Sequence, residues 1–305
     1  MANAPPTAAT VASAEAAPDA SAEAASPAPD AGPPADAGPK RPELPRGGRE
    51  LFPTHRLVGY CGTPGAPALG PLLGNLAKKT KALEAQAAPY AEDRTLLPVF
   101  ELIAVVVQSY EGADKKHRRR VDSTVVDAYL EAARAAKGLL LLNIQPGQSD
   151  FLTEVKVFEK YLREPDVGVA LDPEWAMPKG VKPGKYYGHT KGPVLEEVAS
   201  YLEGLVREGD LPEKALVFHQ VEASVVREEA ALTAHPGIVW IKSVDGLGPK
   251  HTKITTYNLL MKTTNPVVHA GFKLFYEEDK SNGGRLMKPT EVLALTPKPE
   301  YVMYE

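Results

Sequence analysis

Residues 167–175 read VGVALDPEW, and this stretch decides the fold class. Its even-numbered residues are small and then acidic, whereas its odd-numbered residues up to Leu171 are branched and apolar. In a β-strand, alternate side chains point to opposite faces. A strand with small residues on one face and branched aliphatic residues on the other suits the wall of a (β/α)8 barrel. The interior of such a barrel is closely packed, and helices cover its outside. We therefore expect the fourth strand of such a barrel here, with Asp172 and Glu174 at its end.

Short apolar runs alternate with helical patterns along the rest of the chain. Eight strands are expected, at residues 57–60, 96–104, 139–145, 167–174, 215–220, 238–245, 267–276 and 301–304. Helices are expected at residues 71–88, 123–137, 150–162, 193–207, 223–234, 251–261 and 289–293, several opened by a capping-type residue such as Asp150. Strict alternation indicates a parallel sheet. The count of eight, with polar residues ending nearly every strand, favours a TIM barrel over an open doubly wound sheet.

The beginning of the chain differs in composition from the rest. The first forty residues contain 16 Ala and 8 Pro, no aromatic residue, and Val11 as the only large aliphatic residue. Such a segment cannot bury enough apolar surface to offset its chain entropy, and proline keeps it extended. We therefore predict a disordered Ala/Pro/Asp-rich linker at residues 1–48 and one barrel domain at residues 49–305. The barrel's 257 residues match the ~250 of a typical TIM barrel.

Charge separates the same two segments and argues against several classes of protein. Residues 1–40 hold five acidic residues and Lys40, which accounts for the whole net charge of −4 and leaves residues 41–305 neutral. A neutral domain lacks the basic face expected of a nucleic-acid-binding protein. Cys61 is the only cysteine, so an intrachain disulfide and a cysteine metal site are excluded. No glycine-rich motif with nucleotide-binding spacing follows a strand. We expect no nucleic-acid partner and no cofactor.

The distribution of apolar residues along the chain gives an expectation for the cellular location of the protein. No run of 18 apolar residues is present, so no transmembrane segment is expected, and the first residues lack the apolar core of a signal peptide. Ala/Pro-rich tethers commonly separate a cell-envelope domain from its anchor. We therefore expect an extracytoplasmic protein, in the cell envelope or secreted, whose native precursor would carry a signal and could carry a lipid anchor. A cytoplasmic protein with an unusual tail is the alternative, and the sequence indicates no oligomeric state.

Asp172 and Glu174 are the strongest candidates for chemistry. At positions i and i+2 of a strand they would point the same way, with Cα atoms about 6.5–7 Å apart. One carboxylate at that distance raises the pKa of the other, which is how a general acid is kept protonated near neutral pH. TIM barrels place their active sites at this end of the strands. Passive ligand contacts, loop caps or a buried ion network with Lys273 are the alternative roles for the pair.

Further polar residues are expected at the same end of the barrel. Asp245 and Glu101 are the candidates for a second catalytic acid, and a turn or helix cap is the alternative role of Asp245. The other residues mix amides, tyrosines and a lysine with a single histidine, which suits a ligand rich in hydroxyl or amide groups better than a metal ion. These expected substrate-binding residues are Tyr60, Glu101, Asn143, Gln145, Trp175, His219, Gln220, Lys273 and Tyr276.

Two surface segments near this end could also contact a ligand. Residues 175–191 form a long connection with several aromatic side chains, which are the usual surface for stacking sugar rings. Residues 115–120 read KKHRRR and could either be a solvated loop or bind an anionic polymer.

The Asp172-x-Glu174 motif resembles the catalytic motif of chitinase-like and lysozyme-like barrel glycoside hydrolases. The resemblance covers three positions. It implies that Glu174 is the general acid and that Asp172 assists it or orients an N-acetyl group of the substrate. Chitinase-like enzymes carry further aspartates before the pair, where this chain has Gly168 and Ala170.

Five motifs spread over the barrel carry a second resemblance. They are GYCGTPG at 59–65, IQPG at 144–147, ALDPEW at 170–175, HQ at 219–220 and GFKLFY at 271–276. In this order they are similar to a poorly characterised family of bacterial exported barrel proteins, often lipoproteins or partners of cell-wall-binding modules. That family usually has Asp where this chain has Asn143. The resemblance implies the barrel fold but no specific activity.

These observations lead to two main hypotheses. The first is a glycoside hydrolase that acts on a cell-envelope or environmental polysaccharide, with Glu174 as general acid and Asp172 assisting. The second is a non-catalytic glycan-binding TIM barrel tethered to the cell envelope, which the amide at Asn143 favours. A barrel enzyme for a small metabolite is a third reading, because Asn282-Gly283-Gly284 could form a phosphate-binding turn.

Overall fold

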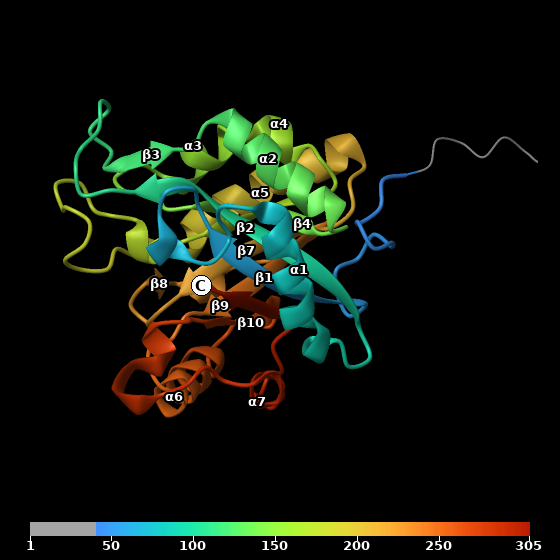
Figure 1. Cartoon of the computed structure of the whole chain (residues 1–305). Helices are drawn as coiled ribbons and strands as arrows, with labels where there is room; N and C mark the ends of the chain where they lie inside the picture. The colour runs from blue at the N-terminus through green and yellow to red at the C-terminus, as the bar shows by residue number, and fades with distance from the viewer. Residues whose placement is uncertain (1–40) are drawn as a thin grey trace, which may run out of the picture. The chain divides into compact units, whose positions relative to one another are not determined.

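Eight parallel strands close into a barrel in the computed structural model, which describes residues 41–305 (Figure 1). The strands follow one another around the barrel in chain order, and the last pairs with the first. The predicted (β/α)8 barrel is therefore confirmed, while residues 1–40 of the predicted linker lie outside the described residues. The barrel strands are β1 (His55–Gly62), β2 (Thr95–Val107), β4 (Leu139–Ile144), β5 (Val167–Leu171), β7 (Lys214–Gln220), β9 (Ile238–Val244), β10 (Val268–Leu274) and β11 (Tyr301–Tyr304).

Helices surround the strands on the outside of the barrel (Figure 1). The predicted cap Asp150 is confirmed, since its side chain accepts a hydrogen bond from the backbone N–H of Thr153 at 2.8 Å, and Asn75 caps the first helix in the same way. No helix of residues 41–305 is long and apolar enough to cross a membrane. The helices are α1 (Leu76–Ala87), α2 (Ser123–Ala135), α3 (Phe151–Lys156), α4 (Glu159–Leu162), α5 (Gly192–Gly209), α6 (Lys250–Met261) and α7 (Pro289–Leu293).

Strand alternation divides the apolar residues between two cores. Inward-facing residues such as Leu141 and Ile241 fill the barrel, and outward-facing residues pack against the helices. β5 follows the predicted pattern, because Ala170 belongs to the inner core while its branched residues belong to the outer one. At Gly168 a Cβ atom would lie 2.6 Å from the carbonyl oxygen of Ala215, so the neighbouring strand can approach this closely only beside a glycine.

The end of β5 differs from the sequence-based expectation. The strand stops at Leu171, and Pro173–Trp175 forms a short 3-10 helix. Proline has no N–H for the ladder and a fixed φ, so the chain turns at this point, and Trp175 N donates to the carbonyl oxygen of Asp172 at 3.0 Å. The prediction that strand alternation alone aligns Asp172 with Glu174 is therefore wrong, because Glu174 lies on a turn.

The helix predicted at residues 223–234 is also wrong. The segment contains the two-residue strand β8 (Val226–Arg227), which pairs with β6 (Thr190–Lys191), and a short 3-10 helix at Glu229–Ala231. The buried β-branched residues Val225 and Val226 suit an extended backbone. Glu228 then adopts a left-handed conformation with φ of 56°, which interrupts any helix. A third short strand, β3 (Arg118–Arg120), pairs antiparallel with β2.

Residues 41–54 cover the end of the barrel at which the strands begin. Leu44 and Leu51 are buried in the inner core. The Arg46 side chain donates to the carbonyl oxygens of Ala136 and Lys137, just before β4. Residues 41–48, assigned to the linker from composition, thus lie against the barrel in the part of the chain that the structure describes.

We predict that Leu44→Ala lowers the free energy of unfolding by roughly 2–4 kcal/mol, because it opens a cavity in a closely packed core. Urea denaturation of the two proteins measures the difference. Leu259→Ala is the matched control: Leu259 is 60% exposed, and its truncation should change stability by less than about 0.5 kcal/mol. Equal effects of the two substitutions would contradict the closure of the barrel by Leu44.

Candidate active site

A ring of polar side chains fills the inside of the barrel near the carboxyl ends of the strands. Each of the eight strands, or the residue directly after it, contributes one member. The members of the ring are buried except for Glu305, which is partly exposed, and hydrogen bonds or ion pairs connect them. It consists of Cys61, Glu101, Asn143, Asp172, His219, Asp245, Lys273 and Glu305.

An amide bridges two acids on one side of the ring. Asn143 Nδ2 lies 2.9 Å from both Glu101 Oε1 and Asp172 Oδ1, and donates to each. Gln145 Nε2 donates to the other oxygen of Asp172 at 3.0 Å. Burial raises the pKa of Asp172, although the charges of His219 and Lys273 oppose that rise. The two amides therefore fix the orientation of a carboxyl group that burial makes costly to ionise.

His219 joins the two halves of the ring. Its Nδ1 lies 2.8 Å from Asp245 Oδ2, and its Nε2 lies 3.1 Å from Glu101 Oε1. Burial alone would lower the pKa of His219, but the charges of Asp245 and Glu101 outweigh it and raise this pKa well above the usual value. The imidazole is therefore a buried cation held between two carboxylates.

Asp245 contacts both cationic side chains of the ring, His219 and Lys273. Burial opposes ionisation, but the charges of His219 and Lys273 and a hydrogen bond from Ser243 lower the pKa of Asp245 to about 2. Lys273 Nζ lies 3.3 Å from Asp245 Oδ2 and 2.6 Å from Glu305 Oε2. Its pKa is raised well above the usual value because these carboxylates outweigh its burial. Lys273 is thus an ammonium group rather than a free amine.

Glu174 stands apart from this paired network. Its side chain is buried, and its Oε2 atom has no hydrogen-bond partner among residues 41–305. Burial, followed by the charges of Asp172 and Asp245, raises the pKa of Glu174 well above the usual value. Burial and the neighbouring carboxylates therefore favour the protonated form of Glu174.

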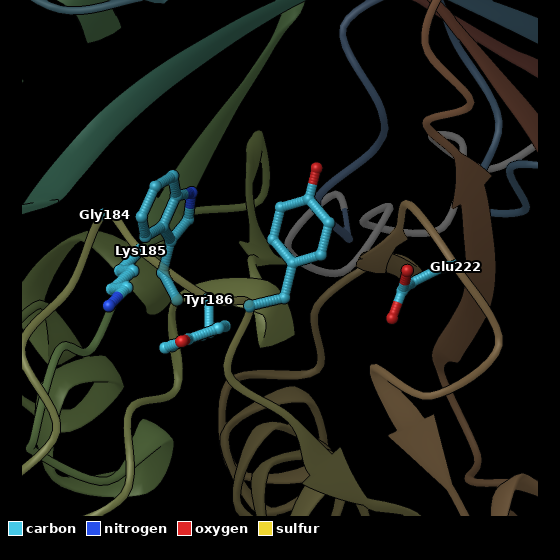
Figure 2. Close-up of a pocket in the computed structure, with 6 residues that line it drawn as sticks. Gly184, Lys185, Tyr186 and Glu222 are labelled. Atoms are coloured by element: carbon cyan, nitrogen blue, oxygen red, sulfur yellow. The ribbon is translucent and has the colours of Figure 1, made fainter.

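Two neighbouring pockets open at this end of the barrel. The smaller has a volume of about 180 Å³ and is lined by Asp172, Glu174, Asp245 and Lys273 among others. The larger has a volume of about 580 Å³ and is lined by Trp175, Gly184, Lys185, Tyr186, Tyr187 and Glu222. Figure 2 shows the larger pocket, with Lys185 and Tyr186 on one side and Glu222 on the other. Trp175 and Tyr187 line both pockets and so connect them.

The loop that carries these aromatic residues is fixed at its base. Gly188 N donates to the carbonyl oxygen of Glu174 at 2.6 Å, and His189 N donates to that of Ala176 at 3.2 Å. A Cβ atom on Gly188 would lie 2.3 Å from the same oxygen of Ala176, so the two ends of the loop can meet only at a glycine. The loop tip is exposed, since Tyr186 is 65% exposed.

No protein-family model matches this chain, and no curated protein matches it. The structure establishes the barrel fold, and no relative indicates the chemistry of the site.

The structure brings together six of the residues predicted for the site. They line the smaller pocket: Gln145, Asp172, Glu174, Trp175, Asp245 and Lys273. Three others, Glu101, Asn143 and His219, lie behind the pocket surface and position the residues that line it.

The remaining predicted residues face away from the pockets. Tyr60 and Tyr276 belong to the outer core, where they pack beside Tyr304. Strand parity explains the position of Tyr60, because the inward residues of β1 are its odd-numbered neighbours such as Cys61. Gln220 is buried on the outward side of β7, and its carbonyl oxygen accepts from Asp245 N at 3.0 Å.

Sequence reasoning missed several pocket residues. Glu305 could have been found by parity, since Tyr301 and Met303 point inward on the same strand. Glu278 and Glu222 lie on connections, where no periodic signal exists. Leu69 and Leu247 complete the apolar part of the smaller pocket from other connections.

The basic run at residues 115–120 is mostly engaged within the protein. Arg118 and Arg120 both bind the buried carboxylate of Glu154 on α3, and Arg118 also pairs with Asp114. This network favours a structural role for the run over an anion-binding one. Within residues 41–305, no group of three or more His, Cys, Asp or Glu side chains could hold a metal ion.

We predict that Asn143→Asp destabilises the protein at neutral pH by about 3 kcal/mol or more, because it places a carboxylate between Glu101 and Asp172 and removes their shared donor. The new carboxyl group would have a folded-state pKa above its unfolded value, so the folded protein binds more protons and the deficit shrinks as pH falls. Urea denaturation across a pH series measures this. Asn143→Ala adds no charge and should depend less on pH. An Asn143→Asp protein as stable as the original at neutral pH would contradict the bridging role.

Proposed function

We propose that the protein is a glycoside hydrolase with Glu174 as its general acid. The observation that carries the proposal is a buried carboxyl group in a pocket beside the ionised Asp245. Its Oε2 atom has no hydrogen-bond partner among the described residues, and its pKa is raised well above the usual value. Glycoside hydrolases commonly use a pair of carboxyl groups in which one donates a proton and the other is ionised. The resemblance of Asp172-x-Glu174 to the motif of chitinase-like and lysozyme-like barrels supports the same assignment.

The proposed reaction begins with proton donation to the glycosidic oxygen. Glu174 gives its proton to this oxygen as the bond to the anomeric carbon breaks, so the leaving sugar departs as a neutral alcohol. Positive charge develops on the sugar ring, and the neighbouring carboxylates stabilise it. Water then adds to the anomeric carbon, and its proton passes to a carboxylate. In an inverting enzyme that carboxylate is a second acid, whereas in a retaining enzyme Glu174 recovers the proton.

Asp172 and Asp245 have different proposed roles. Asp172 is held by the amides of Asn143 and Gln145, which suits the orientation of a substrate group and the raising of the Glu174 pKa. Asp245 lines the pocket and has a pKa of about 2, so it is ionised under all physiological conditions. Glu101 does not line the pocket, which makes Asp245 the better candidate for the second catalytic acid.

The aromatic pocket supports a polysaccharide substrate. Trp175 and Tyr187 line both pockets, so a chain of sugars could place one ring beside Glu174 and stack the next on aromatic faces. We include in the proposal an extracytoplasmic location and a substrate in the cell envelope or the environment.

We predict that Glu174→Gln lowers kcat/KM for glycan hydrolysis by about 10²–10⁴-fold, because glutamine cannot donate a proton to the leaving oxygen. Product release from peptidoglycan, chitin and acidic glycan fragments measures this. The pH profile of the original protein should fall at high pH with a pKa above the ordinary glutamate range, since deprotonation of Glu174 ends activity.

Glu277→Gln is the matched control, because Glu277 is exposed and does not line the pocket. It should leave hydrolysis unchanged. Saturable binding of a glycan without any product, in both the original protein and Glu174→Gln, would refute catalysis and support a glycan-binding barrel.

A further inference from the structure

The smaller pocket carries more negative charge than its proposed chemistry needs. Five carboxyl groups line it, against a single ammonium group from Lys273. The carboxyl groups belong to Asp172, Glu174, Asp245, Glu278 and Glu305.

Internal pairing does not remove this excess. Lys273 already contacts both Asp245 and Glu305, so one ammonium group serves two carboxylates. Behind the surface, the charge of His219 is matched by Glu101. The other three lining acids, Asp172, Glu174 and Glu278, have no cationic partner among the lining residues.

The transition state of hydrolysis accounts for only part of this charge. One carboxylate facing the anomeric carbon is sufficient to stabilise an oxocarbenium-like ion. Glu278 is exposed on the connection after β10 and is not a member of the ring, yet it lines the pocket. A ligand that brings its own positive charge would match the remaining carboxylates.

A second observation points to the same ligand. Glu174 Oε2 is buried in the pocket wall without a hydrogen-bond partner among the described residues, so it can accept or donate a bond to a bound group. The adjoining pocket adds the aromatic faces of Trp175 and Tyr187 together with Glu222, and aromatic faces attract cations as well as sugar rings.

We propose that the substrate is a glycan of amino sugars that are not acetylated, whose ammonium groups bind the carboxylates of the smaller pocket. This inference rests on the proposed function, because it takes the occupant of the pocket to be a sugar. It replaces the N-acetyl group expected from the resemblance to chitinase-like enzymes with a free ammonium group.

The test compares three hexasaccharides with the same β-1,4 linkage: one of glucosamine, one of N-acetylglucosamine and one of glucose. They differ only in the group at C2. Calorimetric titration of the whole protein at mildly acidic pH and low salt should give binding of the glucosamine chain that is about tenfold or more tighter than that of the other two. Added salt should weaken only this binding, since it screens charge. Equal or tighter binding of either uncharged chain, or no binding of the glucosamine chain, would overturn the inference.

Glu278 and Glu277 provide a matched pair of variants. Glu278→Gln removes a carboxylate from the pocket and should weaken binding of the glucosamine chain by about two- to fivefold, the effect of one exposed ion pair. Glu277→Gln removes the same charge one residue away, outside the pocket, and should not change it. The same loss in both variants would mean that net charge, and not the pocket, attracts the ligand.

Cleavage separates this inference from the proposed function. Tight binding of the glucosamine chain with no cleavage of any chain would leave the ligand assignment standing and refute hydrolysis. Cleavage of an uncharged chain in preference to the glucosamine chain, with loss of that cleavage in Glu174→Gln, would establish hydrolysis and refute the ammonium ligand.

Discussion

The contact of His219 with Asp245 and Glu101 is the interaction on which the polar end of the barrel depends. Eight strands converge there, and their inward side chains have little access to water. Acids packed at this density repel one another unless buried cations lie among them. His219 and Lys273 supply those cations, and the amide of Asn143 donates to both Glu101 and Asp172. Glu174 is outside this set of paired charges, and its pKa is raised well above the usual value.

The fold could be predicted from the sequence because it depends on periodicity. The alternation of β5 between Ala170 and branched residues determines which face is inside, and the structure follows it. The same parity places Glu101, Asn143, His219 and Lys273 inside. Tyr60 and Tyr276 were assigned to the site by their proximity to strand ends alone, and the structure places Tyr60 on the outward face of β1 and Tyr276 in the outer core.

Irregular segments were predicted less well, for physical reasons. Pro173 turns the chain before Glu174, so the position of the acid depends on a turn and not on strand geometry. The helix expected at residues 223–234 does not form, because Val225 and Val226 are buried against other connections in an extended conformation. This is a tertiary effect, and it leaves no local signature in the sequence. Glu278 and Glu222 reach the pockets from such connections, which is why the charge balance of the site could not be read from strand ends.

The close backbone approach at Gly188 holds the two ends of the aromatic loop together. Backbone hydrogen bonds at Glu174 and Ala176 anchor the two ends of the loop, while its tip is exposed to solvent. Insertions or exchanges between these anchors would leave the barrel strands and the buried charges undisturbed. A single segment of the chain can therefore change the surface beside the smaller pocket, while the buried acids stay the same.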